Sequence, residues 1–496
     1  MRSTAFFGRI YTSFEPTKVV DSLLAVNGTV VLAGDSRRIE AACRELECDE
    51  VDVSRGVGMP GFIDAHMHLS GLAIQDEGVD LRGVKSVEEL RARVRDYLKA
   101  HPSLSVVLGR GWDDNLMGRT PTSADIDDIV GGRPALLIRV CGHAALVSSS
   151  ALGSLDLSGL SGFIDRGPDG SPTGVIREDA VIRALRQLEP GPEEYMTYVE
   201  AEARRLVSQG ITAVGFINVP LKLMPGLTSG SLPIRLRLYL DADALGLLEA
   251  LGVHGGFGND MVKVSGIKVF ADGSLGARTA YLSEPYSDDP GNRGRALVDE
   301  AYMSATLRRA SALGLQVAVH AIGDAALDVL LRGSKGMREH LRVEHASLVR
   351  DDQLPALRGL RIAIQPMFRV DDAPWIRSRL GDRVRWAYRF REMLSAGAAL
   401  GLSTDAPVSP TDPWLNLAAA TEGLEGVGQA LSAEEALHAY TRGSAEVLGD
   451  ERLGSLEVGS LADLIVASRD PLEVEPGELK GVRTLETYVG GLRVYP

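Results

Sequence analysis

The central part of the chain repeats one unit, in which a helix ends on glycine and a short apolar strand follows at once. The unit occurs as RRLVSQG before ITAVGF, as RRASALG before LQVAVH and as EMLSAG before AALGLSTD. Helices that end on glycine and lead into apolar or β-branched runs are typical of βα repeats, which build a parallel sheet. Strands are predicted near residues 61–66, 211–216, 234–240, 263–270, 316–320, 341–345, 361–366 and 399–404.

Eight strands of this kind favour an α/β protein with a (β/α)8 TIM barrel, which we assign to residues 59–452. An open doubly wound sheet stays an alternative, but no glycine fingerprint follows the first strand to support it. The stretch between the first two strands is far longer than one crossover helix requires. We therefore expect an inserted subdomain after barrel strand 1, at about residues 69–205.

Both ends of the chain are rich in short β-like runs. Residues 1–58 contain LLAV and TVVLAG with Asn-Gly and Gly-Asp turns, and residues 453–496 contain ADLIVAS and LRVYP. Neither end has enough strands to form a core of its own. We expect the two ends to meet in one small sheet domain.

Charge and cysteine content restrict the partners and the location. A formal net charge of −14 argues against binding to a phosphate backbone, and no segment resembles a signal peptide or a membrane span. Cys43, Cys48 and Cys141 show no metal-binding or redox spacing, so we expect ordinary thiols in a reducing compartment. The prediction is a cytoplasmic protein without nucleic-acid or membrane partners.

One lysine lies in an apolar strand. In GIKVFADGSLGARTA, residues 266–280, alternation places Lys268 on the same face as Phe270, whereas Lys263 points to the other face. A strand buried on both faces disfavours an ammonium group, because desolvation penalises the charged form. Either Lys268 is paired with a nearby carboxylate such as Asp272, or it serves as a neutral amine.

Two histidines end the first predicted strand. In GFIDAHMHLS, His66 and His68 alternate with Met67, so both imidazoles project from one face, as two ligands of one metal would. Taken alone, the pair is better explained by chance or by packing than by a metal. His320 ends QVAVH and His345 ends LRVEH, where a single histidine is more often structural.

These side chains are expected to meet at one rim. Asp405 ends the last strand in GLSTDAP, and although Asp before Pro commonly caps a turn, it adds a carboxylate to the histidines and Lys268. Barrel active sites lie at the carboxyl ends of the strands. Nitrogen and carboxylate ligands suit Zn²⁺, with Mn²⁺, Fe²⁺ or Co²⁺ as alternatives, so a metal site is predicted there.

The set of motifs resembles one known family. PGFIDAHMHL, GIKVFADGSLGARTA, VAVHAIGD, RVEHASL, LSTDAPV and GSLEVGSLADLIVASRDP occur in this order over essentially the whole chain. Together they resemble the amidohydrolase superfamily, and most closely its family 3 branch, which contains N-substituted formamide deformylases and related metal-dependent hydrolases. The resemblance implies that the two β-rich ends form a small β-sandwich.

The resemblance also implies roles for individual residues. His66 and His68, with Asp405, would hold the more buried of two metals, expected to be Zn²⁺, and His320 and His345 would hold the second. Lys268 would bridge both as N6-carboxylysine. GRGWDDN, VCGHAALVSSSAL and GVIRED resemble recurring segments of this branch. Candidate substrate-binding residues are therefore Trp112, His143 and Glu178, with ordinary structural roles as the alternative.

The predicted activity is hydrolysis of an amide or another non-peptide carbon–nitrogen bond of a small molecule. A metal-bridging hydroxide would attack the carbonyl, with Asp405 as general base. Alternatives are a single-metal deaminase, a lactone or ester hydrolase, and a non-catalytic regulatory protein on the same fold. Formation of a homo-oligomer is left open by the sequence.

Overall fold

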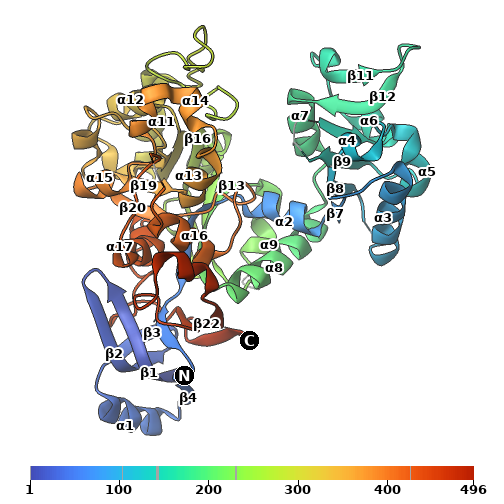
Figure 1. The fold of residues 1–496 in the computed structure, drawn as a ribbon. Helices are drawn as coiled ribbons and strands as arrows, with labels where there is room; N and C mark the ends of the chain where they lie inside the picture. Colours follow the sequence, from blue (N-terminus) through green and yellow to red (C-terminus); the bar gives the residue numbers. More distant parts are fainter. Residues whose placement is uncertain (1, 103, 141–143, 230–231, 425) are drawn as a thin grey trace. The chain divides into compact units, whose positions relative to one another are not determined.

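The computed structural model describes residues 2–102, 104–140, 144–229, 232–424 and 426–496, and shows a mixed α/β fold. The chain divides into two compact units (Figure 1). The first consists of Met1–Leu69 with Ala203–Pro496, and the second is the continuous segment Ser70–Glu202. Each unit has its own sheets and core, and each is described separately below.

A nearly closed barrel of eight parallel strands forms the centre of the first unit. The strands lie in chain order, which excludes the doubly wound alternative, and all eight predicted strands are confirmed. Backbone hydrogen bonds of 2.9 Å from Asp405 to His66 and from His68 to Ala406 join the segment after the last strand to the first strand. The barrel strands are β6 (Phe62–Met67), β13 (Ile211–Val219), β14 (Arg235–Asp241), β16 (Val262–Phe270), β17 (Gln316–Ala321), β18 (Leu341–His345), β19 (Arg361–Ile364) and β20 (Ala399–Leu402).

Glycines end the helices before two of these strands, as the repeat predicts. Gly314 precedes β17 with φ 65°, and Gly397 precedes β20 with φ 88°, a left-handed conformation that favours glycine. The helices of this unit are α1 (Ser36–Leu46), α9 (Met224–Leu227), α10 (Leu245–Leu251), α11 (Glu300–Ala312), α12 (Asp324–Gly333), α13 (Pro366–Asp372), α14 (Ile376–Leu380), α15 (Phe390–Ser395), α16 (Pro413–Thr421), α17 (Ala433–His438) and α18 (Ser444–Leu448).

The two ends of the chain share one eight-stranded sheet, in which the blue and red strands of Figure 1 meet. The junction is the antiparallel pairing of β5 with β21, and Phe6, Leu23, Leu464 and Tyr488 belong to the core beneath it. β-Sandwich packing of this part stays a prediction. The strands are β1 (Ser3–Phe14), β2 (Thr17–Val26), β3 (Thr29–Ala33), β4 (Asp49–Asp52), β5 (Val57–Pro60), β21 (Leu464–Ala467), β22 (Thr484–Val489) and β23 (Leu492–Tyr495).

The cysteine prediction is wrong for two of the three residues. Cys43, on α1, forms a disulfide with Cys48, and Cys141 lies outside the described residues. A separation of five residues lets the chain turn back at the end of α1, a geometry that the spacing alone did not reveal. The cysteines therefore no longer support the predicted cytoplasmic location. Among the described residues, no helix combines the length and the apolar character that a membrane span requires.

The second unit contains a six-stranded sheet with helices packed on it. Trp112 on β8 lies in its core, together with residues of α3 such as Leu90 and Val94. The strands are β7 (Val79–Asp80), β8 (Val107–Trp112), β9 (Ala135–Arg139), β10 (Ala144–Val147), β11 (Ile164–Arg166) and β12 (Pro172–Arg177). The helices of this part of the chain are α2 (Leu69–Glu77), α3 (Val87–Ala100), α4 (Asp114–Met117), α5 (Asp127–Val130), α6 (Ser149–Ser154), α7 (Asp179–Gln187) and α8 (Pro192–Ser208).

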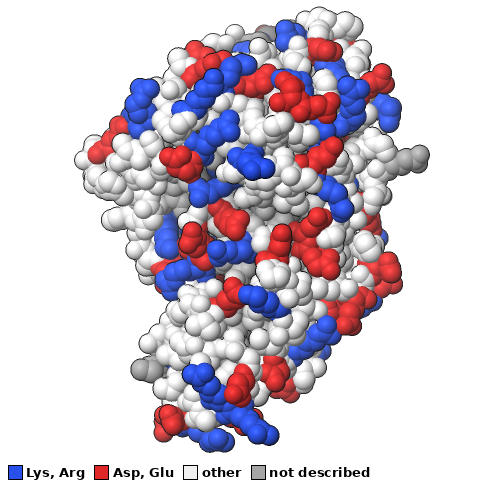
Figure 2. Space-filling view, turned by 90° about the vertical axis from the view of Figure 1, so that its left-hand side faces the viewer, with Lys and Arg blue, Asp and Glu red and all other residues white. Residues whose placement is uncertain are grey.

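Charged side chains of both signs are interspersed on the face shown in Figure 2. Lysines and arginines alternate there with aspartates and glutamates, so this face carries no continuous basic stripe of the kind that a phosphate backbone attracts.

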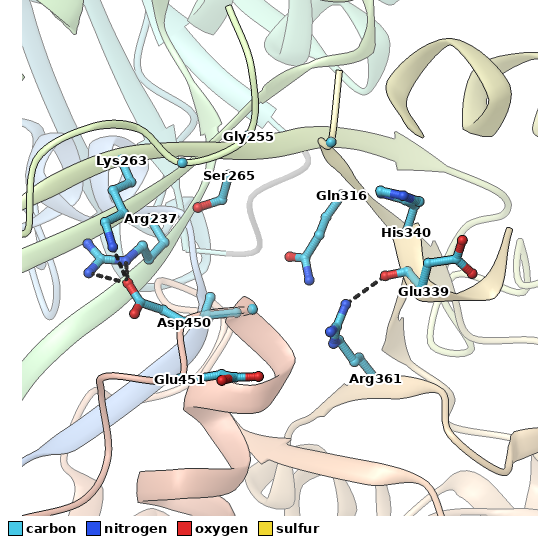
Figure 3. Close-up of a pocket in the computed structure, with 14 residues that line it drawn as sticks. Arg237, Gly255, Lys263, Ser265, Gln316, Glu339, His340, Arg361, Asp450 and Glu451 are labelled. Carbon is cyan, nitrogen blue, oxygen red and sulfur yellow. Dashed lines mark hydrogen bonds and ion pairs between the residues drawn. The ribbon is translucent and has the colours of Figure 1, made fainter. Parts of the chain in front are cut away.

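A cavity of about 430 Å³ lies at the amino-terminal ends of the barrel strands, and we call it the floor cavity (Figure 3). Lys263 Nζ donates to Asp450 Oδ2 here at 2.8 Å, so Lys263 is paired at the end of the barrel opposite to the predicted metal ligands. The charged lining is balanced between cations and carboxylates: Arg237, Lys263 and Arg361 against Asp450, Glu339 and Glu451.

A buried ion pair joins the barrel to the terminal sheet. Arg235, at the start of β14, contacts both carboxylate oxygens of Asp463, just before β21, at 2.6 and 2.8 Å. The exposed fractions of the two side chains are 3% and 6%. Asp463 also accepts a hydrogen bond from the backbone N–H of Gly490 at 2.7 Å.

Replacing Asp463 with alanine should lower the free energy of unfolding by about 3–5 kcal/mol, because it leaves the Arg235 guanidinium buried without its counter-ion. Equilibrium urea denaturation measures the loss. The matched control is Glu249→Ala, which breaks the exposed pair with Arg309 and should cost about 0–1 kcal/mol. Equal losses in the two variants would show that the Arg235–Asp463 pair does not join the two sheets energetically.

Candidate metal centre

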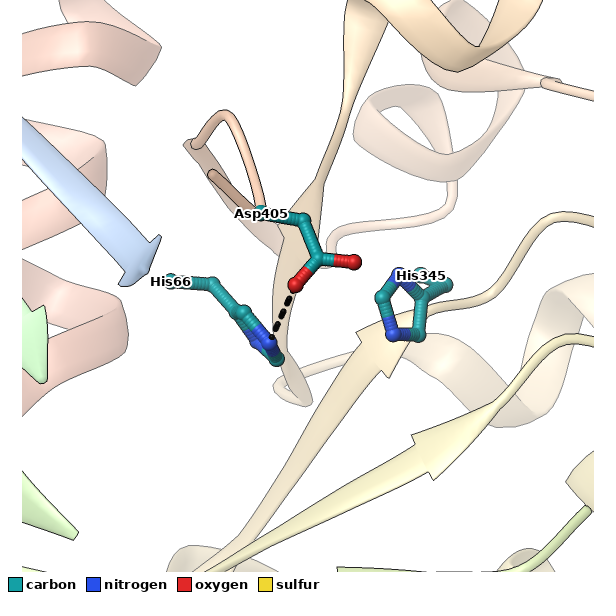
Figure 4. Close-up of side chains that lie close together, drawn as sticks. All are labelled: His66, His345 and Asp405. Carbon is teal, nitrogen blue, oxygen red and sulfur yellow. Dashed lines mark ion pairs between the residues drawn. The ribbon is translucent and has the colours of Figure 1, made fainter. Parts of the chain in front are cut away.

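Three predicted ligands meet where β6, β18 and β20 end. The candidate ligand atoms of His66, His345 and Asp405 all lie within 4.8 Å of one another, and all three residues are buried (Figure 4). His68 faces the same carboxylate: Asp405 Oδ1 lies 3.1 Å from His66 Nε2 and 3.2 Å from His68 Nε2. His66 at the end of β6 and His68 just after it therefore present their imidazoles to one carboxylate oxygen.

Two of these residues have left-handed backbones. φ is 75° at His345 and 55° at Asp405, a region that non-glycine residues rarely adopt and that costs about 1–3 kcal/mol each. The bend at His345 interrupts strand alternation, so that Glu344 and His345, although adjacent, both reach His66: the His345 ring centroid lies 5.2 Å from that of His66. Backbone outliers of this kind concentrate at functional sites.

His320 and His345 form a second pair of imidazoles, with ring centroids 4.5 Å apart. His320 Nε2 lies 3.0 Å from the carbonyl oxygen of Gly273, so Nδ1 is its nitrogen for a ligand role. His345 Nδ1 lies 2.8 Å from Gln365 Oε1, so Nε2 is the corresponding nitrogen. Each ring is thus oriented through one nitrogen, which leaves the other for a metal.

Lys268 is buried, with an exposed fraction of 2%, and its Nζ makes no hydrogen bond to any described residue. Its Nζ lies 4.9 Å from the centroid of the Phe270 ring. Burial lowers the pKa of Lys268 to about 8, although the charges of Glu344 and Asp405 act in the opposite direction. The Lys268 side chain is thus desolvated, and its Nζ has no hydrogen-bond partner in the described part of the chain.

The alternative pairing of Lys268 with Asp272 is not found. Both carboxylate oxygens of Asp272 accept backbone N–H bonds of 2.8–3.0 Å, from Tyr281, Ile322 and Gly323. Burial raises the pKa of Asp272 to about 7, although these hydrogen bonds act to lower it. Asp272 therefore anchors the loops after β16 and β17, next to His320.

The ionisation states suit a metal site. Burial lowers the pKa of His68, that of His320 to about 4, and that of His345 well below its usual value. These imidazoles are therefore neutral near pH 7, which is the form that binds metals. Burial opposes ionisation of Asp405, but the facing histidines hold the pKa of its carboxyl well below the usual range.

The residues present fit a divalent cation. Several buried atoms at this rim make no hydrogen bond of acceptable geometry within the described chain, among them His66 Nε2, Lys268 Nζ and Asp405 Oδ1. A buried polar atom without a partner costs about 1–3 kcal/mol, and a cation bound between nitrogen and carboxylate donors removes that cost. This donor set is the one that Zn²⁺ and related ions prefer.

Sequence reasoning missed the residues that orient these ligands. Glu344 contacts His66 Nδ1, and Asp64 accepts from Thr404 Oγ1 at 2.6 Å and from the backbone N–H of His66 at 3.1 Å. Glu344 stands beside His345 in RVEH, where regular strand alternation would put it on the opposite face. Only the bend at His345 brings both side chains to the site.

The predicted substrate-binding residues belong to the second unit. Trp112 has an exposed fraction of 1%, and its Nε1 donates to the carbonyl of Leu137 at 2.6 Å. Glu178 is exposed at the start of α7, with φ 45°, and His143 lies outside the described residues. The role of these residues in substrate binding stays a prediction.

Comparisons with known proteins match nearly the whole chain to one protein family. The model of the family described as "Amidohydrolase family" matches residues 49–495, a range that includes all six candidate ligands. The YtcJ protein of Bacillus subtilis is 30% identical over 98% of this chain and 98% of its own length. The N-substituted formamide deformylase of Arthrobacter pascens is 25% identical over 96% of this chain and 94% of its own length.

A solved structure shows the same similarity. The crystal structure of an uncharacterized metal-dependent hydrolase from Pyrococcus furiosus is 40% identical, with a TM-score of 0.88 over 95% of this chain and 100% of that chain.

Replacing His345 with alanine should weaken the binding of Zn²⁺, because one of the clustered nitrogen donors is lost. Titration calorimetry on chelator-stripped protein measures the affinity, and elemental analysis measures the metal content. His340→Ala is the matched control, because His340 lines the floor cavity and its Nδ1 lies 3.1 Å from the carbonyl of Leu315. Wild-type affinity in His345→Ala would remove this residue from the metal centre.

Proposed function

The chain belongs to the amidohydrolase family, and we propose that it hydrolyses an amide or another non-peptide carbon–nitrogen bond of a small molecule. The observation that carries the proposal is the set of buried atoms without hydrogen-bond partners at the carboxyl ends of the barrel strands: His66 Nε2, Lys268 Nζ and Asp405 Oδ1. Chemistry in barrels of this type takes place at that rim. Paired charges instead fill the opposite end, around the floor cavity.

Two divalent cations, with Zn²⁺ as the proposed ion, fit the number of donors. When bound, they supply Lewis-acid activation of a water molecule and of a substrate carbonyl. The proposed ligands are His66, His68, Lys268, His320, His345 and Asp405. Burial favours the neutral imidazoles that this role requires at His320 and His345.

We assign Lys268 as N6-carboxylysine. Its neutral amine would attack the carbon of CO₂, a C–O π pair would move to oxygen, and the nitrogen would release one proton to give an anionic carbamate. Burial without a hydrogen-bonded partner in the described chain supports the neutral amine. A carbamate has two oxygens and a negative charge, so it can face two cations that an ammonium would repel.

Asp405 is the proposed general base. Its Oδ1 lies 3.1 Å from His66 Nε2 and 3.2 Å from His68 Nε2, and its backbone has a left-handed φ of 55°. From this position it would take the proton of the attacking water and deliver it to the leaving nitrogen. The name of the Arthrobacter pascens relative suggests N-substituted formamides as the first substrates to test.

One alternative function also has direct support from the structure. His66, His345 and Asp405 would by themselves suffice for one cation, as in a single-metal deaminase. A metal-to-protein ratio near one, with an unmodified Lys268, would favour that rival. Hydrolysis of lactones or esters by the same site is tested in the same substrate panel, because the fold does not determine the substrate.

Replacing Asp405 with asparagine should lower kcat by at least about 10²-fold, because the amide cannot accept the proton, while its oxygen can still coordinate a metal. Steady-state kinetics on formamides, amides, lactams and esters, together with elemental analysis, measures both effects. Asp352→Asn, at an exposed position, is the control and should keep full activity. Full activity of Asp405→Asn with normal metal content would refute the general-base role.

Carboxylation of Lys268 should give a carbamate signal in ¹³C NMR of metal-loaded protein exchanged with ¹³C-bicarbonate. The signal should disappear in Lys268→Met and persist in Lys263→Met, because Lys263 is paired with Asp450 at the floor cavity. A carbamate signal that Lys268→Met retains would place the modification elsewhere. No signal in wild-type protein would contradict the bridging role of Lys268.

A further inference from the structure

The imidazole of His66 is held from behind by a carboxylate. His66 Nδ1 contacts Glu344 Oε2, and both side chains have exposed fractions of 0%. An ionised carboxylate only accepts hydrogen bonds, so the contact places a proton of the ring on Nδ1. This tautomer directs the lone pair of Nε2 toward Asp405 Oδ1, 3.1 Å away, at the centre of the ligand cluster.

Glu344 is fixed in turn by Arg342, two residues earlier on β18. Arg342 Nε lies 2.6 Å from Glu344 Oε1, and Arg342 Nη2 donates to Glu344 Oε2 at 3.0 Å. The same Nη2 donates to the carbonyl oxygen of Ala65, the residue before His66. One guanidinium therefore connects the carboxylate to the backbone of β6 beside the ligand.

Residues deeper in the barrel hold the guanidinium. Arg342 lies over the ring of Tyr239 at 4.7 Å from the centroid, and the Tyr239 hydroxyl donates to Gln316 Oε1. Gln316 lines the floor cavity. A continuous series of buried polar side chains thus runs through the barrel to His66, so rotation of Glu344 would break contacts at several points.

His345 has a different kind of support. Its Nδ1 is held at 2.8 Å by the neutral amide of Gln365, which is itself bound to Ser403 Oγ at 2.8 Å. An anion behind an imidazole raises its strength as a metal donor more than a neutral amide does. His66 and His345 are therefore unequal ligands, although both belong to the same cluster.

A purely structural role explains this geometry poorly. A fully buried ion pair is often no more stabilising than apolar side chains of similar volume, because both charges lose their hydration. An ion pair that served only the fold would have no reason to direct its second carboxylate oxygen to a metal-ligand histidine. The Arg342–Glu344 pair also contacts His66, and a role in stability alone does not require that contact.

We infer that Glu344, held by Arg342, is the positioning residue of the metal ligand His66. It selects the tautomer and the orientation of the ring, and it strengthens Nε2 as a donor. The inference rests on the metal centre proposed above, and it assigns to two residues that do not touch substrate a direct effect on metal affinity.

The test compares Glu344→Gln, Glu344→Gln/Arg342→Met and Asp450→Asn with the wild type. Glu344→Gln gives His66 the same kind of support as His345 has, and the double variant also removes the guanidinium that would be left unpaired. Asp450→Asn is the matched control, because Asp450 forms a buried ion pair with Arg237 at the floor cavity. Zn²⁺ affinity of chelator-stripped protein is measured by competition with a chromophoric chelator, and thermal unfolding is followed in parallel.

Glu344→Gln and the double variant should bind Zn²⁺ about 10–100-fold more weakly than the wild type. The absorption spectrum of the Co²⁺-loaded variants should change as well, because the coordination by His66 is altered. Asp450→Asn should lower the unfolding temperature and leave Zn²⁺ affinity unchanged. This pattern separates positioning of His66 from a general loss of stability.

Two results would overturn the inference while leaving the proposed function intact. One is wild-type Zn²⁺ affinity in the double variant, and the other is an equal loss of affinity in Asp450→Asn. Failure of the stripped wild-type protein to bind any divalent cation would overturn the metal centre itself and this role with it, and that outcome is visible in the wild-type measurement alone.

Discussion

Closure of the parallel sheet between its first and last strands is the constraint on which the site depends. Two backbone hydrogen bonds of 2.9 Å join His66 and His68 to the segment at Asp405 and Ala406, and Thr404 adds side-chain and backbone bonds to Asp64. Because of this seam, residues separated by more than half of the chain lie within hydrogen-bond distance. Without it the carboxylate and the two histidines of β6 would belong to opposite edges of a sheet.

Buried charged groups are paired differently at the two ends of the barrel. At the floor, Arg237 and Lys263 share Asp450, and Arg235 pairs with Asp463, so each buried carboxylate there has cationic partners. At the carboxyl rim, buried atoms such as Lys268 Nζ and Asp405 Oδ1 make no hydrogen bond within the described chain. Paired charges serve stability, whereas buried polar atoms left without partners need a ligand to satisfy them. The contrast supports the proposal that the chemistry takes place at the rim.

The sequence predicted the barrel well, because its strands and glycine-ended helices are local patterns. The eight predicted strands agree with the structure to within a few residues, and Lys268, not Lys263, lies at the end of the barrel that holds the candidate ligands. Prediction was poorer where the backbone leaves its regular path. Strand alternation assigns Glu344 and His345 to opposite faces, and only a φ of 75° at His345 brings both to His66. The Cys43–Cys48 disulfide was missed for a similar reason, since spacing does not show how a helix end turns back.

Two residues of the candidate site, His345 and Asp405, have left-handed backbone conformations. His345 and Asp405 each adopt a conformation that costs about 1–3 kcal/mol, and surrounding hydrogen bonds hold them there: the N–H of Asp405 to His66, and the N–H of Ala346 to Ala321 at 3.0 Å. A protein selected for stability alone would gain by relaxing both residues. Relaxation would, however, turn the His345 ring away from His320 and the Asp405 carboxylate away from His66 and His68. We interpret the strain as the energetic cost of bringing side chains from three strands to one point, a cost that binding of the proposed metal would offset.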